Sequence, residues 1–351
     1  MFRTSWLVLA ALVLSASPVT AQKTDVVTIQ NGNAVTGEIK QLDRGKLEYG
    51  TDDMGTLQIE WTKVQRLVSV WYFEVEQRSG RRYYGTFLDE ADPGTLIVAL
   101  PPRRDTLLLG SIIRITPIEA GFWQRLDGYI DVGFSYAKAN QAINLTSNGR
   151  ANYRGRKWGG TITAQSYFQK QDTVGTTNGS VELSLERYLG EQRWAVGVFT
   201  SAEQNEVQGL ALRGRFGANV GRAMVHTNSS IMKLTAGVAV SSERHNEEGS
   251  DPGVQAPDTT SVSWEGVFQF EWAVFRFDSP ELDILTKINA FPSITDFGRV
   301  VSDGEVRFQY EVIRDFFLGF NVTANLDTRP PSTTDVSKLD FRTEMTVGWS
   351  F

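Results

Sequence analysis

Two histidines are the residues of this chain whose type and surroundings could support catalysis. His226 precedes Ser229 and Ser230 by three and four positions, so its imidazole could act as the base for a serine nucleophile in hydrolysis or acyl transfer. That spacing is also common in ordinary solvated turns, which is the simpler interpretation. We therefore expect no catalysis, with an outer-membrane hydrolase or acyltransferase as the alternative from a different class.

The second histidine lies in an acidic segment that could hold a divalent cation. His245 is followed by Glu247, Glu248, Asp251 and Asp258. Oxygen ligands need a fixed geometry, whereas the many Gly, Pro and Ser residues here favour a solvated loop. No zinc spacing, nucleotide loop or glycosidase pair stands out, and we expect no metal and no cofactor.

Residues 1–21 have the features of a secretory signal peptide. Arg3 supplies the positive charge, 7–16 form a short apolar stretch, and Val19 and Ala21 precede the expected cleavage site. No other segment approaches the ~20 consecutive apolar residues of a transmembrane helix. A membrane location would therefore require a closed barrel.

Composition restricts the possibilities further. The absence of cysteine excludes a disulfide framework and a thiol nucleophile, and the net charge of −6 argues against nucleic acid as a partner. The 32 glycines, 20 Phe, 9 Trp and 10 Tyr are scattered through alternating segments, which favours an all-β protein.

An internal repeat organises residues 25–118. Its copies are 25–70 and 71–118, and Gly32 recurs 48 positions later as Gly80, each in a tight-turn signal. The repeat predicts two five-stranded small barrels in tandem, and its turn spacing resembles SH3-like or Sm-like modules.

Aromatic residues of this region could bind a periplasmic protein, a glycan or the cell wall. The alternative is that most of these rings fill two small cores. The residues are Trp61, Trp71, Tyr72, Tyr83 and Tyr84.

Residues 123–351 follow a different pattern, with long runs in which apolar and polar residues alternate. In 339–351 (LDFRTEMTVGWSF) the odd positions are apolar apart from Thr343, and the even positions are polar, charged or small. A period of two predicts strands with two different faces. About twelve such strands are predicted, starting near residues 126, 144, 159, 178, 193, 209, 231, 261, 281, 303, 317 and 339.

Four features favour a transmembrane antiparallel barrel over a soluble one. The number of strands is even, and short connections alternate with longer ones. The apolar face carries essentially no charge over its middle. The polar face combines charges of both signs with small residues. Aromatic residues also gather at the short-turn ends, as in an interfacial girdle. These aromatic residues are Trp123, Trp158, Tyr188, Trp194, Phe275, Phe277, Phe316 and Trp349.

The charged residues of the polar face are expected to line the lumen. Mutual pairing would close the lumen, whereas segregated patches of one sign would favour conduction. The expected lumen-lining residues are Arg150, Arg154, Glu182, Glu186, Arg213, Arg215, Glu265, Glu271, Arg307, Glu311, Arg342 and Glu344.

The first hairpin, 126–158, resembles domain-of-unknown-function family 481 (DUF481), whose members are often called salt-induced outer-membrane proteins. The resemblance rests on the Gly128 to Gly133 spacing, a polar turn and a strand of small residues ending in Arg, and on 326–331 (LDTRPP) and the terminal VGWSF. It covers about residues 120–351. It implies the fold and the outer membrane, and it brings no established activity.

These features predict a Gram-negative outer-membrane barrel that anchors a periplasmic β-module. The alternative is a narrow channel for small polar solutes or ions, gated or tethered by the module. With twelve strands, both termini would be periplasmic and the 243–260 loop would face the cell surface. A final strand with Trp349 that ends on Phe351 resembles the signal recognised by the outer-membrane assembly machinery.

Overall fold

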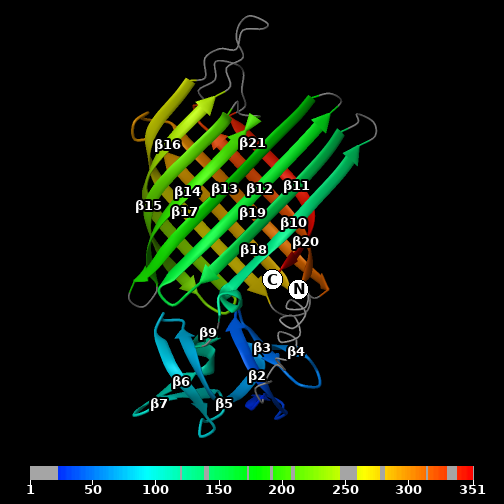
Figure 1. Ribbon diagram of the computed structural model, residues 1–351, viewed down its shortest axis with the longest axis vertical. Helices are drawn as coiled ribbons and strands as arrows, with labels where there is room; N and C mark the ends of the chain where they lie inside the picture. The colour runs from blue at the N-terminus through cyan, green and yellow to red at the C-terminus, as the bar shows by residue number, and fades with distance from the viewer. Residues whose placement is uncertain are drawn as a thin grey trace, which may run out of the picture.

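The computed structural model describes residues 23–118, 121–137, 142–171, 174–189, 193–206, 210–245, 259–276, 281–313, 315–329 and 338–350. An N-terminal β-domain lies at one end of a closed β-barrel (Figure 1). Within these residues, no helix is long and apolar enough to cross a membrane. The predicted signal peptide lies outside the described residues.

The N-terminal domain is a nine-stranded sheet in which β4-β3-β2-β1-β5-β6-β7-β8 are neighbours and β9 pairs with both β2 and β5. Its elements are β1 (Asp25–Ile29), β2 (Ala34–Asp43), β3 (Lys46–Gly50), β4 (Thr56–Glu60), η1 (Trp61–Lys63), β5 (Val64–Gln77), β6 (Arg82–Leu88), β7 (Thr95–Leu100), β8 (Arg103–Leu108), η2 (Leu109–Ser111) and β9 (Ile112–Pro117).

The internal repeat appears in the order of these elements. Four strands, a single-turn 3₁₀ helix and a fifth strand occur twice, and β5 serves as the last strand of the first copy and the first strand of the second. β1 pairs with the first half of β5, and β9 pairs with its second half. Each copy therefore joins its first strand to its fifth.

The tandem of two separate small barrels is not confirmed, because the two copies share one sheet and one core. β5 runs through the predicted boundary as a continuous strand with an irregularity between Ser69 and Phe73. One cluster of buried residues contains Val27 and Leu47 of the first copy together with Leu96 and Ile115 of the second.

The second part of the chain is a closed barrel of twelve antiparallel strands in sequence order, which confirms the predicted fold and strand number. The short helix η3 (Trp123–Arg125) precedes it. The strands are β10 (Leu126–Ala137), β11 (Ala142–Arg154), β12 (Trp158–Gln171), β13 (Val174–Leu189), β14 (Trp194–Asn205), β15 (Leu210–His226), β16 (Ser230–His245), β17 (Thr259–Arg276), β18 (Leu282–Pro292), β19 (Val300–Ile313), β20 (Phe316–Asp327) and β21 (Leu339–Ser350).

The two ends of the barrel differ. The end that faces the N-terminal domain, here called the domain-side rim, carries the short connections. β16 ends and β17 begins at the opposite, loop-side end, and these two strands have the longest separation in sequence (Figure 1). The segment 170–179 belongs to β12 and β13 outside 172–173, although its polar composition is typical of a loop. Its Thr and Gly residues extend the hairpin because neighbouring strands supply the backbone partners.

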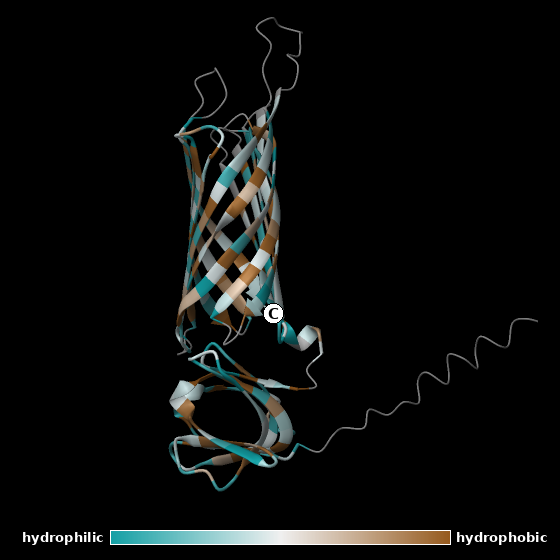
Figure 2. Ribbon diagram, turned by 90° about the vertical axis from the view of Figure 1, so that its left-hand side faces the viewer, coloured by the Kyte–Doolittle hydropathy of each residue, from teal (hydrophilic) through white to brown (hydrophobic). Residues whose placement is uncertain are grey.

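The outer face of the barrel is apolar. Phe134, Phe216, Phe268 and Phe341 are exposed there, and the alternation along each strand is visible as bands of colour in Figure 2. Exposed apolar side chains all around a closed barrel are what contact with lipid requires.

Aromatic residues lie on the outer face of the barrel at the domain-side rim. Trp158 and Trp194 are exposed there, and Arg187 and Arg222 place their guanidinium groups over these two rings. Tyr188 and Phe275 point inward instead: Arg154 lies over the Tyr188 ring, and Phe275 is buried beneath Arg44. Phe277 lies outside the described residues.

Candidate functional site

The N-terminal domain contacts the domain-side rim through charged side chains of its β2–β3 turn. Arg44 lies 3.7 Å from Asp127 and 3.5 Å from Asp283, and its guanidinium is 5.5 Å from the centre of the Phe275 ring. Lys46 forms an ion pair with Glu281 at 3.2 Å. The turn is tight because Gly45 has a φ of 79°. Two cations of the domain therefore meet three carboxylates of the barrel.

A second set of contacts has the opposite polarity, with cations on the barrel and carboxylates on the domain. Arg154 of β11 lies 3.1 Å from Glu76, and Arg156 lies 3.5 Å from Glu74. Burial alone would raise the pKa of Glu76, but Arg154 and other nearby cations outweigh burial and hold that pKa below its usual value. Glu76 thus stays ionised within this interface.

Further contacts extend around the rim. The Asn228 side chain, in the β15–β16 turn, donates a hydrogen bond to the Ile112 carbonyl at 2.9 Å. Arg193, just before β14, donates to the Arg78 carbonyl at 2.9 Å. Together with the ion pairs, these contacts join the domain to β10, β11, β14, β15 and β18, on several sides of the mouth.

Inside the barrel, a cavity of about 490 Å³ lies directly behind this interface. The domain contributes Asp43, Arg44, Lys46 and Arg114 to its lining, and side chains from the barrel wall complete it. Arg114 also pairs with Asp43 at 2.6 Å. The cavity is therefore bounded by both parts of the protein.

Farther into the barrel, ion pairs cross the interior. Arg150 of β11 lies 3.2 Å from Glu271 of β17, and Lys287 of β18 lies 3.4 Å from Glu182 of β13. These strands are not neighbours in the barrel, so each pair spans the lumen rather than following the wall. The lumen is narrowed at this level.

A larger cluster lies near the loop-side end. Arg213 contacts Glu203, Glu243 and Asp327 at 3.2, 2.7 and 3.6 Å, and Arg299 bridges the same Glu243 and Asp327 at 2.9 and 2.6 Å. Of these, Arg213, Glu243 and Asp327 are 3% exposed or less. Carboxylates and guanidinium groups so deeply buried require such pairing.

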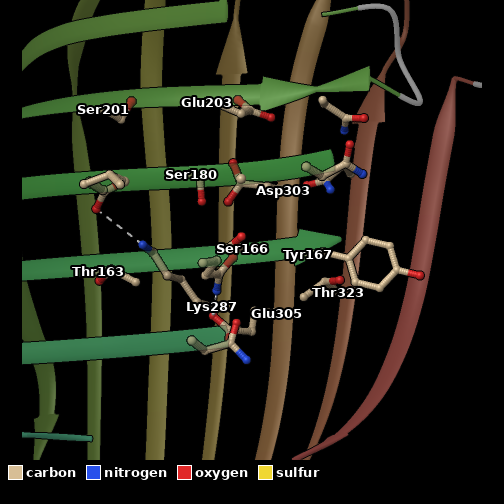
Figure 3. A pocket seen from close by; sticks show the side chains of 18 of the residues that line it. Thr163, Ser166, Tyr167, Ser180, Ser201, Glu203, Lys287, Asp303, Glu305 and Thr323 are labelled. Carbon is tan, nitrogen blue, oxygen red and sulfur yellow. Dashed lines mark hydrogen bonds and ion pairs between the residues drawn. The ribbon is translucent and has the colours of Figure 1, made fainter. Parts of the chain in front are cut away.

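A second cavity, of about 140 Å³, lies between these two levels of charge (Figure 3). Figure 3 shows hydroxyl groups of Ser166, Ser180 and Thr323 around it, together with Glu203 and Lys287. Its lining is mainly polar.

The structure places the twelve residues expected to line the lumen as follows. Three pairs form within this set: Arg150–Glu271, Arg215–Glu265 at 2.9 Å and Arg342–Glu344 at 3.5 Å. Arg154 reaches the N-terminal domain, and Glu311 accepts a hydrogen bond from the Asp315 backbone. The other members pair with residues outside the set: Glu182 with Lys287, Glu186 with Lys233, Arg213 with Glu203, Glu243 and Asp327, and Arg307 with Asp131 and Glu305.

Several participants were missed by the sequence-based reasoning. Glu203, Glu243 and Lys287 lie on the polar face of β14, β16 and β18, strands from which no lumen residue was predicted. Applying the period-two rule to these strands as well would have found them. Arg299 lies in the irregular segment before β19, where no period applies.

Of the two histidines considered from the sequence, only His226 has side-chain surroundings that the structure describes. The Ser230 hydroxyl accepts a hydrogen bond from Trp272 Nε1 at 3.0 Å, and His226 lies at the rim near Glu76, Asp43 and Arg154. Glu247, Glu248, Asp251 and Asp258 lie outside the described residues. Within the described ranges, no group of three His, Cys, Asp or Glu side chains could hold a metal ion.

The aromatic residues of the N-terminal domain divide into two classes. Trp61 is buried and donates to the Leu109 carbonyl at 2.8 Å, and Tyr83 packs against the same core. Trp71 and Tyr72 are 47% and 49% exposed, and Tyr84 lies beneath Arg156 of the barrel.

In the final strand, Trp349 is exposed on the outer face and pairs with Phe316 on one side and Ile130 on the other. β21 thereby closes the barrel against β10. Phe351 lies outside the described residues.

A family model matches most of the chain, including nearly the whole barrel. Residues 130–351 match the model of a family described as protein of unknown function, DUF481. No curated protein matches the chain. Among solved structures, the NanC porin in a rhombohedral crystal form is 9% identical (TM-score 0.39, 64% of this chain and 98% of that chain), and a porin refined at 1.8 Å resolution is 10% identical (TM-score 0.29, 93% and 98%).

Proposed function

Because the chain belongs to the DUF481 family, whose function is unknown, we propose a function from its geometry: a non-catalytic outer-membrane anchor that holds a periplasmic β-domain across its inner mouth. The observation that carries this proposal is the distribution of contacts between domain and barrel. Ion pairs of both polarities, Arg44 and Lys46 in one direction and Arg154 and Arg156 in the other, attach the domain on different sides of the rim.

The interior supports a closed barrel. Charges of opposite sign are paired with one another at successive levels, as in the Arg150–Glu271 and Arg213–Glu243 pairs. A lumen built for ion conduction would instead present unbalanced patches of one sign. The N-terminal domain also covers the opening of the barrel at the domain-side rim.

A narrow channel gated by the domain is the second candidate function. It is favoured by the two interior cavities, which share lining residues and so lie on one path through the barrel. The shared residues are Tyr129, Arg150, Thr163, Glu182 and Lys287. Rearrangement of Arg150 and Lys287 together with undocking of the domain would connect both ends.

Planar-bilayer recordings distinguish these functions. The samples are the full-length mature protein and a variant lacking residues 23–120, each shown to be folded by heat-modifiable gel mobility. The anchor predicts no conductance from either sample. Conductance from the truncated variant alone would support the gated channel, and conductance from both would mean that the barrel is open.

Orientation follows from the same proposal, with the N-terminal domain and both termini in the periplasm and 246–258 at the cell surface. Protease added to intact cells should cleave within 246–258 and leave the N-terminal domain intact. Cleavage of the domain with sparing of that loop would reverse the orientation, and recovery of the protein in the soluble periplasmic extract would exclude the barrel.

The domain would present its outward surface to an envelope partner. Trp71 and Tyr72 are its adjacent exposed rings, and we propose the cell wall as the partner. Purified peptidoglycan sacculi should co-sediment the full-length protein. Replacement of both rings by alanine should abolish co-sedimentation without changing the gel mobility of the folded barrel, and unchanged co-sedimentation would exclude this surface.

A further inference from the structure

The cavity of about 140 Å³ inside the barrel contains buried polar atoms that lack partners. Within the described part of the chain, Asn178 Nδ2, Arg215 Nη2, Asn289 Oδ1 and Asn321 Oδ1 form no hydrogen bond. All four residues line this cavity, and their exposed fractions are 6%, 5%, 3% and 3%. A buried polar group without a partner costs about 1–3 kcal/mol, so four around one cavity indicate that something else supplies their hydrogen bonds.

The chemistry of these atoms restricts the ligand. Two of them, Asn178 Nδ2 and Arg215 Nη2, are donors, and the other two, Asn289 Oδ1 and Asn321 Oδ1, are acceptors. An anion would satisfy only the donors and a cation only the acceptors. Hydroxyl groups donate and accept together, so a hydroxyl-bearing ligand matches the complete set.

The charges of the lining argue for a neutral ligand. Lys287 pairs with Glu182 at 3.4 Å, Arg215 with Glu203 at 3.4 Å and Arg342 with Glu344 at 3.5 Å. Because these cations are already matched by carboxylates, an added ion would have to compete with an existing pair.

The cavity also has room for more than a single water molecule, which needs about 10–15 Å³ measured in the same way. Hydroxyl groups of Thr163, Ser166, Ser180 and Thr323 surround it (Figure 3). We propose that this cavity is a binding site for a small, neutral, polyhydroxylated solute, of the size of a monosaccharide or a sugar alcohol. Binding at this site does not require conduction through the barrel, and the proposal therefore goes beyond the proposed anchor.

Equilibrium dialysis with detergent-solubilised full-length protein tests this site. The probes are radiolabelled D-glucose and mannitol, with gluconate and glucosamine as charged counterparts of the same carbon skeleton. Saturable binding of at least one neutral probe, at least about tenfold tighter than its charged counterparts, is expected. If neither neutral probe binds saturably, the cavity holds water only and the proposal is wrong. If gluconate or glucosamine binds more tightly than the neutral probes, the proposal of a neutral ligand is wrong.

A matched pair of variants locates the binding. Asn321→Leu removes one unpaired acceptor while keeping the number and branching of the side-chain heavy atoms. It should weaken binding about tenfold or more, the loss expected for one hydrogen bond of about 1.4 kcal/mol. Asn219→Leu makes the same change in the larger cavity, which Asn219 lines, and should leave affinity unchanged. Heat-modifiable mobility must show that both barrels are folded. An equal loss of binding affinity in both variants, or no loss of affinity in Asn321→Leu, would contradict this site.

Discussion

Gly45 of the N-terminal domain lies against Asn228 of the barrel: a Cβ atom built on Gly45 would be 3.4 Å from the Asn228 Cβ. This separation is close to the Cβ–Cβ distance of about 3.8 Å in disulfides. The chain has no cysteine, so an introduced pair can form only one intramolecular bond. The contact therefore offers a direct measurement of docking.

The double substitution Gly45→Cys/Asn228→Cys should form a disulfide between the domain and the barrel. Cysteine at position 45 must adopt the left-handed conformation, at a cost of about 1 kcal/mol, which cross-linking can tolerate. Non-reducing gels and intact mass of the purified protein measure the bond. Gly32→Cys/Asn228→Cys is the control, because Gly32 has a similar φ of 86° and no neighbouring atom within 4 Å of its Cβ position. Absence of the first disulfide, or its equal formation in the control, would contradict the docked arrangement.

The folded protein should become more stable as the pH falls from above 7 toward 4.5. Burial, the neighbouring Asp283 and a hydrogen bond with Glu311 raise the pKa of Glu281 from 4.5 to about 7, although Lys46 opposes this rise. A raised pKa means that the folded form holds the proton more tightly than the unfolded form. Its contribution is complete below pH 4.5 and is lost as the pH rises through 7. Asp43 and Glu76 have lowered pKa values, so their contributions weaken only at more acidic pH.

Denaturant titrations at different pH values, followed by heat-modifiable gel mobility, measure this pH dependence. The free energy of unfolding should rise between pH 7 and 4.5 in the parent protein. Glu281→Gln should abolish that rise, whereas Asp52→Asn, a change at an exposed carboxylate, should preserve it. A pH response that survives Glu281→Gln would assign it to another group.

The buried charge cluster should contribute strongly to barrel stability. Arg213→Met removes a cation that three carboxylates contact, and it should lower the free energy of unfolding by about 3 kcal/mol. This value is near the low end for a broken buried ion pair because Arg299 still contacts Glu243. Denaturant titration followed by gel mobility measures the change. Arg103→Met is the control, because the Arg103 side chain is 82% exposed and its loss should change stability by less than about 1 kcal/mol. Equal stabilities of the two variants would show that the cluster is not a stabilising element.

The strands of the barrel could be predicted from the sequence because lipid on one face and polar groups on the other impose a period of two. The predicted starts near 126, 159 and 281 lie close to the observed starts of β10 at Leu126, β12 at Trp158 and β18 at Leu282 for this reason. The rim contacts could not be predicted in this way. Arg44 and Asp283 are 239 positions apart, and a charged residue in a tight turn has no local feature that identifies its partner.

The shared core of the N-terminal domain was also beyond sequence reasoning. The repeat predicts a separate five-stranded barrel for each copy, whereas the structure has nine strands in one sheet because β5 belongs to both copies. Whether two copies form one core or two depends on whether the chain continues as a strand at their junction. Here β5 does so through the irregularity after Ser69, so that Leu47 and Leu96 enter the same cluster.

The final strand supplies the last prediction, which concerns assembly. β21 completes the barrel by pairing with β10 over Val347–Ser350, and its terminal aromatic residues would be recognised by the assembly machinery before that pairing forms. Deletion of Phe351 should therefore reduce the amount of folded protein in the outer membrane several-fold, more than the loss of one contact explains. The measurement is the heat-modifiable fraction in isolated outer membranes. Phe341→Ala removes another exposed ring of the same strand and should leave assembly nearly unchanged. Equal yields of the two variants would show that the chain end carries no assembly signal.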